Sequence, residues 1–205
     1  MQSPRHGRLR RDRAHLGGFD FTLHMRRLCA DMIHRLPQLG HVDLPRVAIS
    51  FSQARKAVDH GLYASLTPLR FAGGSCHTVR RGQKWTVQRV VDGSGREMLY
   101  LLSFYLPRFL DQPFRHKLIT VVHELWHISP RFDGDLRRFG GRCYAHSASQ
   151  KRYDAQVEQL VDRWLSLDPP ASAYNFLRYE FGELVGRYGR VYGVKVPAPK
   201  LIPIK

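Results

Sequence analysis

His123-Glu124-Leu125-Trp126-His127 is the stretch around which the rest of this sequence is best interpreted. Residues four apart on an α-helix lie roughly 40° apart around the axis and one turn along it. The imidazoles of His123 and His127 can therefore reach one metal ion from the same side. Glu124 can then face a water molecule that the ion activates and accept its proton. The spacing predicts a Zn²⁺ centre with His123 and His127 as ligands and Glu124 as the catalytic base.

The residues around this stretch have the pattern of a buried helix. Apolar side chains recur at helical spacing, at Leu118, Val121, Val122, Leu125 and Ile128. Asp111 can cap the start of the helix, Pro113 and Phe114 suit its first turn, and Ser129-Pro130 should end it. Unpaired polar side chains would be costly in such a helix, which favours a metal-binding role for the histidines.

A catalytic zinc site needs a third protein ligand, and three candidates are present. His146 follows His127 by 19 residues, at the expected start of another helix. Asp133 occupies the place of the third ligand in one class of zinc proteases, although Pro130 replaces the glycine of that pattern. Glu158, with Asp162, resembles the E-x-x-x-D of another class. We favour His146, since imidazole is a common zinc ligand and a loop-to-helix junction lets it turn back.

Several further residues have possible supporting roles. Asp133 or Asp135 could accept a hydrogen bond from a ligand histidine. Tyr144, Tyr153 or an arginine from 137–142 could donate to the oxyanion of an acyl-transfer reaction. Cys143, three residues before His146, could also be a ligand, but a small buried apolar role is more common.

The elements on either side of the motif predict an α+β fold. A helix is expected over 20–36, with Asp20 as its cap, followed by strands over 47–51 and 62–71, the second favoured as an edge strand by Pro68. A hairpin is expected between 85–91 and 97–105, around the turn sequence Asp92-Gly93-Ser94-Gly95. The predicted core is a small, mostly antiparallel sheet packed on the motif helix.

The region after the motif predicts flanking helices and an extended end. One helix is expected over 149–165, with a buried stripe at Tyr153, Val157, Leu160, Val161 and Trp164. Another is expected over 172–188, and 191–205 should be extended, as an edge strand or strap. The expected organisation is therefore a flexible basic arm over 1–18, a metal-binding domain over 19–190 and an extended tail over 191–205.

Composition indicates the environment and partners of the chain. The formal net charge is +16, and the arm contributes five arginines and one aspartate, so most of the charge belongs to the remaining residues. Such a positive field attracts polyanions, and DNA or RNA is a possible partner. Three cysteines without a C-x-x-C pair favour a reducing, cytoplasmic compartment. Since 18 consecutive apolar residues never occur, no membrane span is expected.

A family resemblance rests on two segments, His123–His127 and Tyr144-Ala145-His146-Ser147, each following the expected order of elements. This arrangement resembles the SprT/Spartan-like zinc metallopeptidases and similar phage and bacterial metallopeptidase families, over about residues 45–165. The resemblance implies a zincin-like fold and peptide-bond hydrolysis. It also implies action on DNA-bound proteins in the Spartan branch.

The sequence therefore predicts a zinc-dependent metallopeptidase that acts on a protein or peptide, including nucleic-acid-associated ones. The alternative is a basic nucleic-acid-binding module on a zincin scaffold, with structural metal or none. A metal-dependent nuclease fits less well, because the spacing suits water attack on an acyl carbon better than a cluster of carboxylates around two metals.

Overall fold

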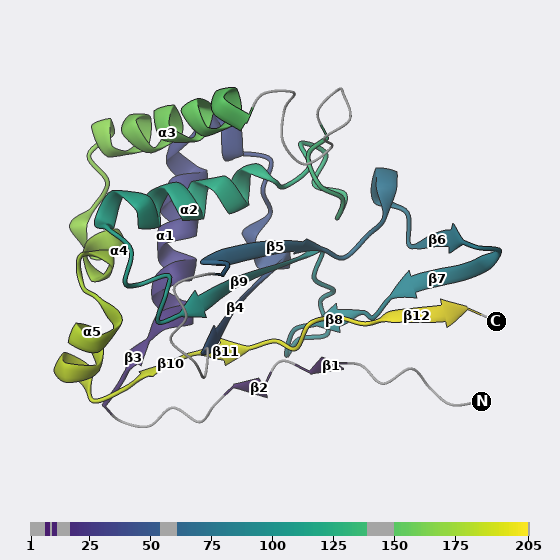
Figure 1. Ribbon diagram of the computed structural model, residues 1–205, viewed down its shortest axis with the longest axis horizontal. Coiled ribbons are helices and arrows are strands. Elements are labelled where there is room, and N and C mark those ends of the chain that lie inside the picture. The colour runs from purple at the N-terminus through teal and green to yellow at the C-terminus, as the bar shows by residue number, and fades with distance from the viewer. Residues whose placement is uncertain (1–6, 9, 12–16, 54–60, 139–149, 205) are drawn as a thin grey trace.

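The computed structural model describes residues 7–8, 10–11, 17–53, 61–138 and 150–204 (Figure 1). Helices lie on one side of a central sheet, and a second, smaller sheet extends away from them. The predicted α+β class is confirmed. Within the described ranges, no helix is long and apolar enough to cross a lipid bilayer.

The central sheet has the strand order β4–β9–β5, formed by β4 (Val47–Gln53), β9 (Tyr100–Leu106) and β5 (Ala64–Pro68). The nearly continuous apolar sequence of β9 is explained by its central place. Strand β5 pairs with β9 in antiparallel orientation and is an edge strand, as predicted. Strand β4 pairs with β9 in parallel, from Val47↔Tyr100 to Gln53↔Leu106. This one pair departs from the mostly antiparallel sheet that was expected, because the long segment between the two strands forms a crossover.

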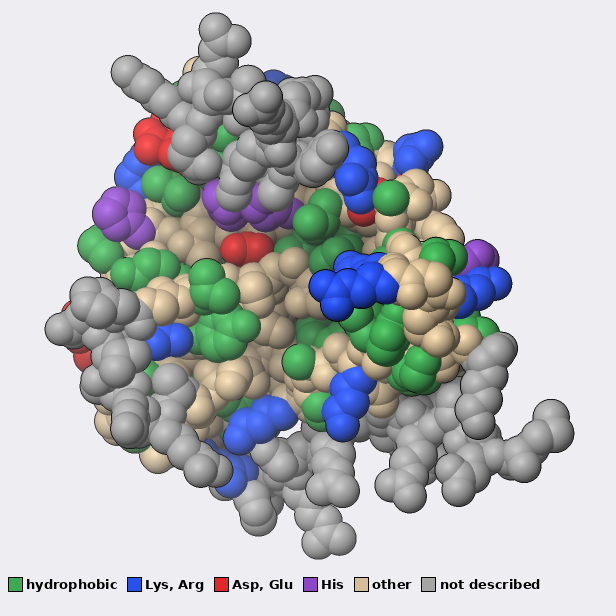
Figure 2. Space-filling model, turned by 45° about the vertical axis from the view of Figure 1, so that its right-hand side comes forward, with side chains coloured by type: hydrophobic (Ala, Val, Ile, Leu, Met, Phe, Trp, Pro, Cys, Tyr) green, Lys and Arg blue, Asp and Glu red, His purple; other side chains and the backbone are tan. Residues whose placement is uncertain are grey.

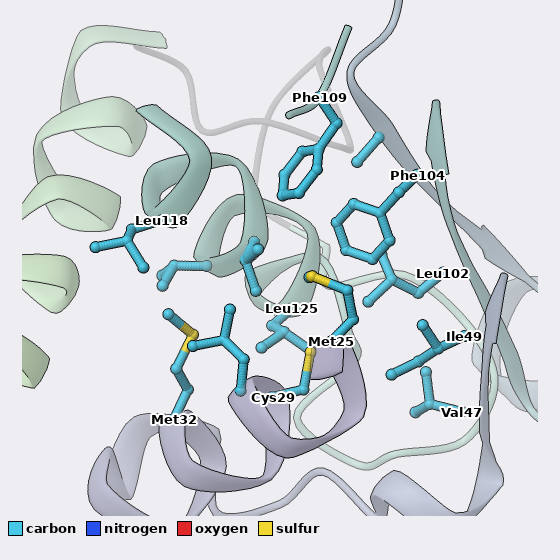
Figure 3. Close-up of a cluster of buried hydrophobic side chains, with 14 of the residues drawn as sticks. Met25, Cys29, Met32, Val47, Ile49, Leu102, Phe104, Phe109, Leu118 and Leu125 are labelled. Atoms are coloured by element: carbon cyan, nitrogen blue, oxygen red, sulfur yellow. The ribbon is translucent and has the colours of Figure 1, made fainter. Parts of the chain in front are cut away.

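The two faces of this sheet pack against different parts of the chain, following the alternation of side chains along each strand. One face carries Val47 and Ile49 of β4 with Leu102 and Phe104 of β9, and it packs against the helices. Figure 3 shows these side chains meeting Met25, Cys29, Met32, Phe109, Leu118 and Leu125. The opposite face carries Ala48 and Leu101 and is covered by a smaller apolar cluster.

Three helices supply most of the main core: α1 (Phe21–Arg35), α2 (Phe114–Trp126) and α3 (Gln150–Ser166). The apolar stripes predicted for α2 and α3 are buried at all five positions each, and α1 buries Phe21, Met25, Leu28 and Met32. Helix α1 is capped by Asp20, whose carboxylate accepts from the backbone N–H of Leu23 at 3.0 Å. Helix α2 contacts both β5 and α3, so the histidine motif lies between the sheet edge and a second helix.

The start of α2 differs from expectation. Its N-cap is Pro113, without a side-chain cap, and the predicted cap Asp111 instead accepts from the backbone N–H of Phe181 at 3.0 Å. The carboxylate thus serves the start of α5 (Phe181–Tyr188) and not α2 itself.

The single helix predicted over 172–188 is also wrong, because this segment is divided. It forms α4 (Ala171–Tyr174), a 3₁₀ turn η4 (Asn175–Arg178) and α5 (Phe181–Tyr188). The buried ammonium of Lys117 on α2 donates to the carbonyls of Leu177 and Tyr179, both at 2.9 Å. Glu180 and Glu183 then begin α5 with a reciprocal capping box.

The predicted hairpin around Asp92 is only partly formed. The turn is present, with Asp92 N–H donating to the Arg96 carbonyl at 2.9 Å and a bridge between Val91 and Glu97. Beyond it the two arms separate, because β9 enters the central sheet. The other arm, β7 (Gln83–Val87), lies between β6 (His77–Arg80) and β12 (Leu201–Ile204) in an antiparallel sheet.

The arm and the tail pair with other strands over short lengths. These strands are β1 (Gly7–Arg8) with β8 (Val90–Val91), β2 (Arg10–Arg11) with β11 (Val194–Lys195), and β3 (Phe19–Asp20) with β10 (Val191–Tyr192). Short 3₁₀ turns complete the described elements: η1 (Pro37–Leu39), η2 (Leu44–Arg46) and η3 (Ala72–Gly74). The tail is extended as predicted and adds β12 to the edge of β7.

Candidate metal centre

The two motif histidines converge. The Nε2 atoms of His123 and His127 lie 3.0 Å apart, and their ring centroids are 4.7 Å apart with planes at 81°. His123 belongs to the last turn of α2, and His127 is its C-cap residue with a helical backbone, φ −69° and ψ −16°. The helical spacing is therefore kept through the end of the helix, and both ring nitrogens face one point.

Glu124 is buried beside this pair, with an exposed fraction of 9%. Burial raises the pKa of its carboxyl to about 7, against the opposing effect of a hydrogen bond from the backbone N–H of Leu66. Leu66 belongs to the edge strand β5, so this contact fixes the carboxylate against the sheet edge. A cation held by the neighbouring histidines would favour the ionised form.

Tyr153 of α3 encloses the pair from the other side. Its hydroxyl lies 3.2 Å from the backbone carbonyl of His123, to which it donates, and 3.4 Å from either ring nitrogen of His127. Its ring stacks on that of His127, with centroids 5.4 Å apart, and burial raises the pKa of its hydroxyl. Of the predicted oxyanion donors, Tyr153 is the one that the described structure brings to the histidines.

This part of the molecule is visible from one side. Figure 2 shows histidine side chains and an acidic side chain next to one another in the hollowed centre of the face. His123 is partly exposed, whereas His127 is 9% exposed. The ring nitrogens are thus held by a packed scaffold yet lie near the surface, where a ligand can reach them.

The structure describes two of the three candidates for the third ligand. His146, with Tyr144 and Cys143, lies outside the described residues. Among the described residues, no third His, Cys, Asp or Glu joins the histidine pair in a metal-binding group. The alternatives Asp133 and Glu158 are described, and neither is grouped with the two histidines in this structure.

Glu158 and Asp133 each lie in surroundings other than the histidine pair. Glu158 is exposed on α3, and its helix neighbour Asp162 forms an ion pair with Arg115 at 2.6 Å. Asp133 accepts from Arg131 Nε at 3.0 Å and from the backbone N–H of Asp135 at 3.2 Å. The polar face of α3 therefore turns toward solvent, and Asp133 stabilises its own loop.

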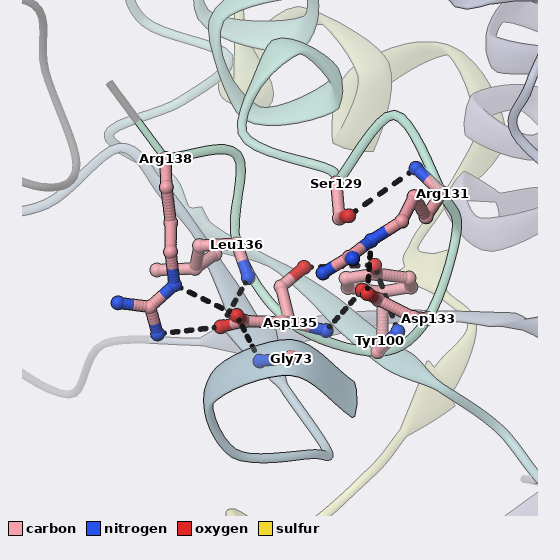
Figure 4. A network of polar contacts seen from close by, with 9 residues as sticks. Gly73, Tyr100, Ser129, Arg131, Asp133, Asp135, Leu136 and Arg138 are labelled. Carbon is pink, nitrogen blue, oxygen red and sulfur yellow. Dashed lines mark hydrogen bonds and ion pairs between the residues drawn. The ribbon is translucent and has the colours of Figure 1, made fainter. Parts of the chain in front are cut away.

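Asp135 organises the loop that follows the motif (Figure 4). Its carboxylate accepts from the backbone N–H of Gly73 and Leu136 and from the guanidinium of Arg138, at 2.8–3.0 Å. Burial alone would raise the pKa of this carboxyl, but these hydrogen bonds outweigh it and hold the pKa below its usual value. The predicted role of Asp133 or Asp135 as an acceptor for a ligand histidine finds no such contact among the described residues, because both carboxylates bind loop groups.

Arg137 closes the C-terminal end of α2. Its Nε donates to the carbonyl of Trp126 at 2.7 Å, its backbone N–H donates to the carbonyl of His127 at 2.7 Å, and its guanidinium lies 3.8 Å from the centre of the Trp126 ring. These bonds satisfy carbonyls that a helix end leaves open. Of the arginines proposed as oxyanion donors, Arg137 is therefore engaged with the helix end and Arg138 with Asp135, while 139–142 lie outside the described residues.

Sequence reasoning missed two contributors to this site. The backbone N–H of Leu66 carries no side-chain signal, and only the prediction of an edge strand beside the motif helix could have indicated it. Arg137 was considered for catalysis, whereas its position just after a helix end was a signal for capping.

Comparisons with protein-family models, with curated proteins and with solved structures find no match to this chain. The interpretation of the site therefore depends on its own geometry.

Proposed function

We propose that this chain is a zinc-dependent metallopeptidase with a zincin-like centre, similar to SprT/Spartan-like enzymes. The observation that supports this most directly is the convergence of His123 and His127 Nε2, 3.0 Å apart, next to the buried carboxylate of Glu124. A carboxylate and two imidazoles on one short stretch are the parts that metal-assisted hydrolysis requires.

The donor set fits a zinc ion. Two imidazole nitrogens on one tetrahedral zinc, each at about 2.0–2.1 Å, lie about 3.3 Å apart. The separation of 3.0 Å between the two Nε2 atoms is close to that value, so a small ring rotation suffices. We assign His146 as the third ligand on the strength of its sequence position. When bound, zinc supplies Lewis acidity, which makes water a better nucleophile near neutral pH and polarises a carbonyl.

Glu124 acts as the base in this proposal. Its carboxylate accepts a proton from the attacking water and passes it to the leaving amine. The hydrogen bond from Leu66 orients the carboxylate, and Tyr153 holds the last turn of α2 through the carbonyl of His123. The protein thus fixes the base and the metal ligands before substrate arrives, which is where much of the rate gain of such sites originates.

The peptide substrate is proposed to bind along β5. This strand is the edge of the central sheet nearest to α2, and a substrate can add to such an edge through main-chain hydrogen bonds. Leu62 and Tyr63, just before β5, are 61% and 44% exposed and offer apolar surface for a substrate side chain.

A pair of glutamate variants tests the proposal. Glu124→Gln should retain zinc, measured by elemental analysis of purified protein, and should lose hydrolysis of a fluorogenic protein substrate by about 100-fold or more. Glu158→Gln, on the exposed face of α3, is the matched control and should keep parental activity. Equal turnover by Glu124→Gln and the parent, or a parent protein that binds no zinc, would overturn the proposal.

A further inference from the structure

The sheet of β6, β7 and β12 carries a concentration of positive charge that the proposed hydrolysis does not use. Its strands and the β6–β7 turn hold Arg80, Arg81 and Lys84, and Lys200 immediately precedes β12. All four side chains are exposed. The sequence contains no acidic residue from Leu69 to Val91 or from Val185 to Lys205, so the charge is not balanced along these segments.

These cations also lack ionic partners in space. None of the four forms an ion pair within the described part of the chain, whereas Arg70 and Arg89 at the base of the sheet both pair with Glu97. Like charges gathered on a small sheet repel one another and destabilise it. A polyanionic ligand would remove that repulsion.

An aromatic ring lies among these charges. Trp85 is on the middle strand β7, directly opposite Thr78 of β6 and Pro203 of β12. Arg80, two residues beyond Thr78, is on the same face and is a diagonal neighbour of Trp85. The Trp85 ring has no stacking or cation–π contact with a described residue, unlike the ring of Trp126 beneath Arg137.

The sheet is accessible. Figure 1 shows it extending from the body away from the helices, and the right-hand part of the face in Figure 2 carries basic side chains beside apolar ones. Leu201, which is opposite Val87 and so on the same face as Trp85, is 44% exposed and adds apolar area to this surface. A cationic surface with an open aromatic ring is the combination that binds single-stranded nucleic acid, with phosphates on the cations and a base on the ring.

We propose that the β6–β7–β12 sheet is a binding surface for single-stranded nucleic acid. Arg80, on the Trp85 face, and Arg81, in the adjoining turn, contact phosphates, and Trp85 stacks on a base. This binding needs neither the metal nor Glu124. Recognition by charge and stacking is tolerant of sequence and sensitive to salt.

The test is fluorescence anisotropy of the full chain with a labelled dT20 strand between 50 and 200 mM salt. Trp85→Ala should weaken binding by about fivefold or more. Arg80→Gln/Arg81→Gln should weaken it and lower the slope of log affinity against log salt by about 1.4. The matched control, Arg27→Gln/Arg163→Gln, removes the same charge from exposed positions on α1 and α3 and should change neither value appreciably.

Intrinsic fluorescence supplies a second readout. Trp126 and Trp164 are 5% and 0% exposed, so quenching on addition of dT20 would report on the partly exposed Trp85. Trp85→Phe keeps a stacking ring and should bind nearly as the parent does, which separates stacking from a folding defect in Trp85→Ala.

Three outcomes would overturn the inference: no binding of dT20 by the parent, equal weakening by the two double variants, or unchanged binding by Trp85→Ala. Stronger binding to a duplex of equal length, or to vesicles containing phosphatidylserine, would assign the charge to another polyanion. Binding that persists in chelator and in Glu124→Gln supports the surface independently of the proposed peptidase activity.

Discussion

The guanidinium of Arg137 caps the end of the motif helix at Trp126 and also stacks on the Trp126 ring. Its Nε donates to the Trp126 carbonyl at 2.7 Å, and its carbon lies 3.8 Å from the centre of the Trp126 ring. His127 is the next residue after Trp126, so the position of this proposed metal ligand depends directly on the contact between Arg137 and Trp126.

Arg137→Ala should therefore loosen the end of α2. We expect a loss of about 1–3 kcal/mol in the free energy of unfolding, since a charge-assisted hydrogen bond and a cation–π contact are removed. Zinc affinity, measured by competition with a chelator, should fall as well. Arg131→Ala, which removes an ion pair of a largely exposed arginine, is the control and should be nearly neutral. Identical denaturation midpoints for the two variants would contradict the capping role.

Tyr153→Phe removes the hydroxyl that contacts the carbonyl of His123 and the ring of His127. We expect zinc affinity or turnover to fall by about 10-fold or more, as for other groups that orient metal ligands. The fold should persist, because the ring still packs. Tyr174→Phe is a suitable comparison on a neighbouring helix. If zinc affinity and turnover of Tyr153→Phe match those of the parent, the hydroxyl has no positioning role.

Asp135 should make the loop after the motif sensitive to acid. Its folded-state pKa is lowered, so its stabilising contribution is present above the unfolded pKa of about 3.9 and is lost as pH falls through the folded value. Asp135→Asn should destabilise the protein at pH 7 and show a smaller further loss below pH 4. Denaturation across this range checks the effect, with exposed Asp43→Asn as the control. A parallel pH dependence in Asp135→Asn and the parent would exclude it.

Lys117→Met should weaken the attachment of the segment that contains α4, η4 and α5 to α2. The ammonium group satisfies the carbonyls of Leu177 and Tyr179, and methionine fills similar space without donating. We expect a cost of about 1–3 kcal/mol, because one buried and one half-buried carbonyl lose their donor. Hydrogen exchange should accelerate over 175–188 more than over α1. The control, Lys200→Met, changes an exposed side chain, and equal exchange in both variants would refute the role.

The elements that the sequence predicted best are those with strong local signals. The apolar stripes of α2 and α3 and the convergence of His123 with His127 follow from helical spacing alone. Wrong predictions arose where distant groups compete with local ones. Asp111 has the chemistry of a cap for α2, yet its carboxylate serves Phe181, 70 residues away. The parallel pairing of β4 with β9 likewise depends on a crossover that no local pattern specifies.

The segments on either side of the main hydrophobic core are hydrogen-bonded to each other. The backbone N–H of Phe19 donates to the carbonyl of Arg190 at 2.8 Å, and Thr22 Oγ1 accepts from Val194 N–H at 2.9 Å, where a side chain on Gly193 would collide with that hydroxyl. During synthesis on the ribosome, the beginning of the first helix therefore cannot form these hydrogen bonds until residues near 190 have been made. Closing so large a loop is entropically demanding, and we expect slow, late docking of these ends during folding.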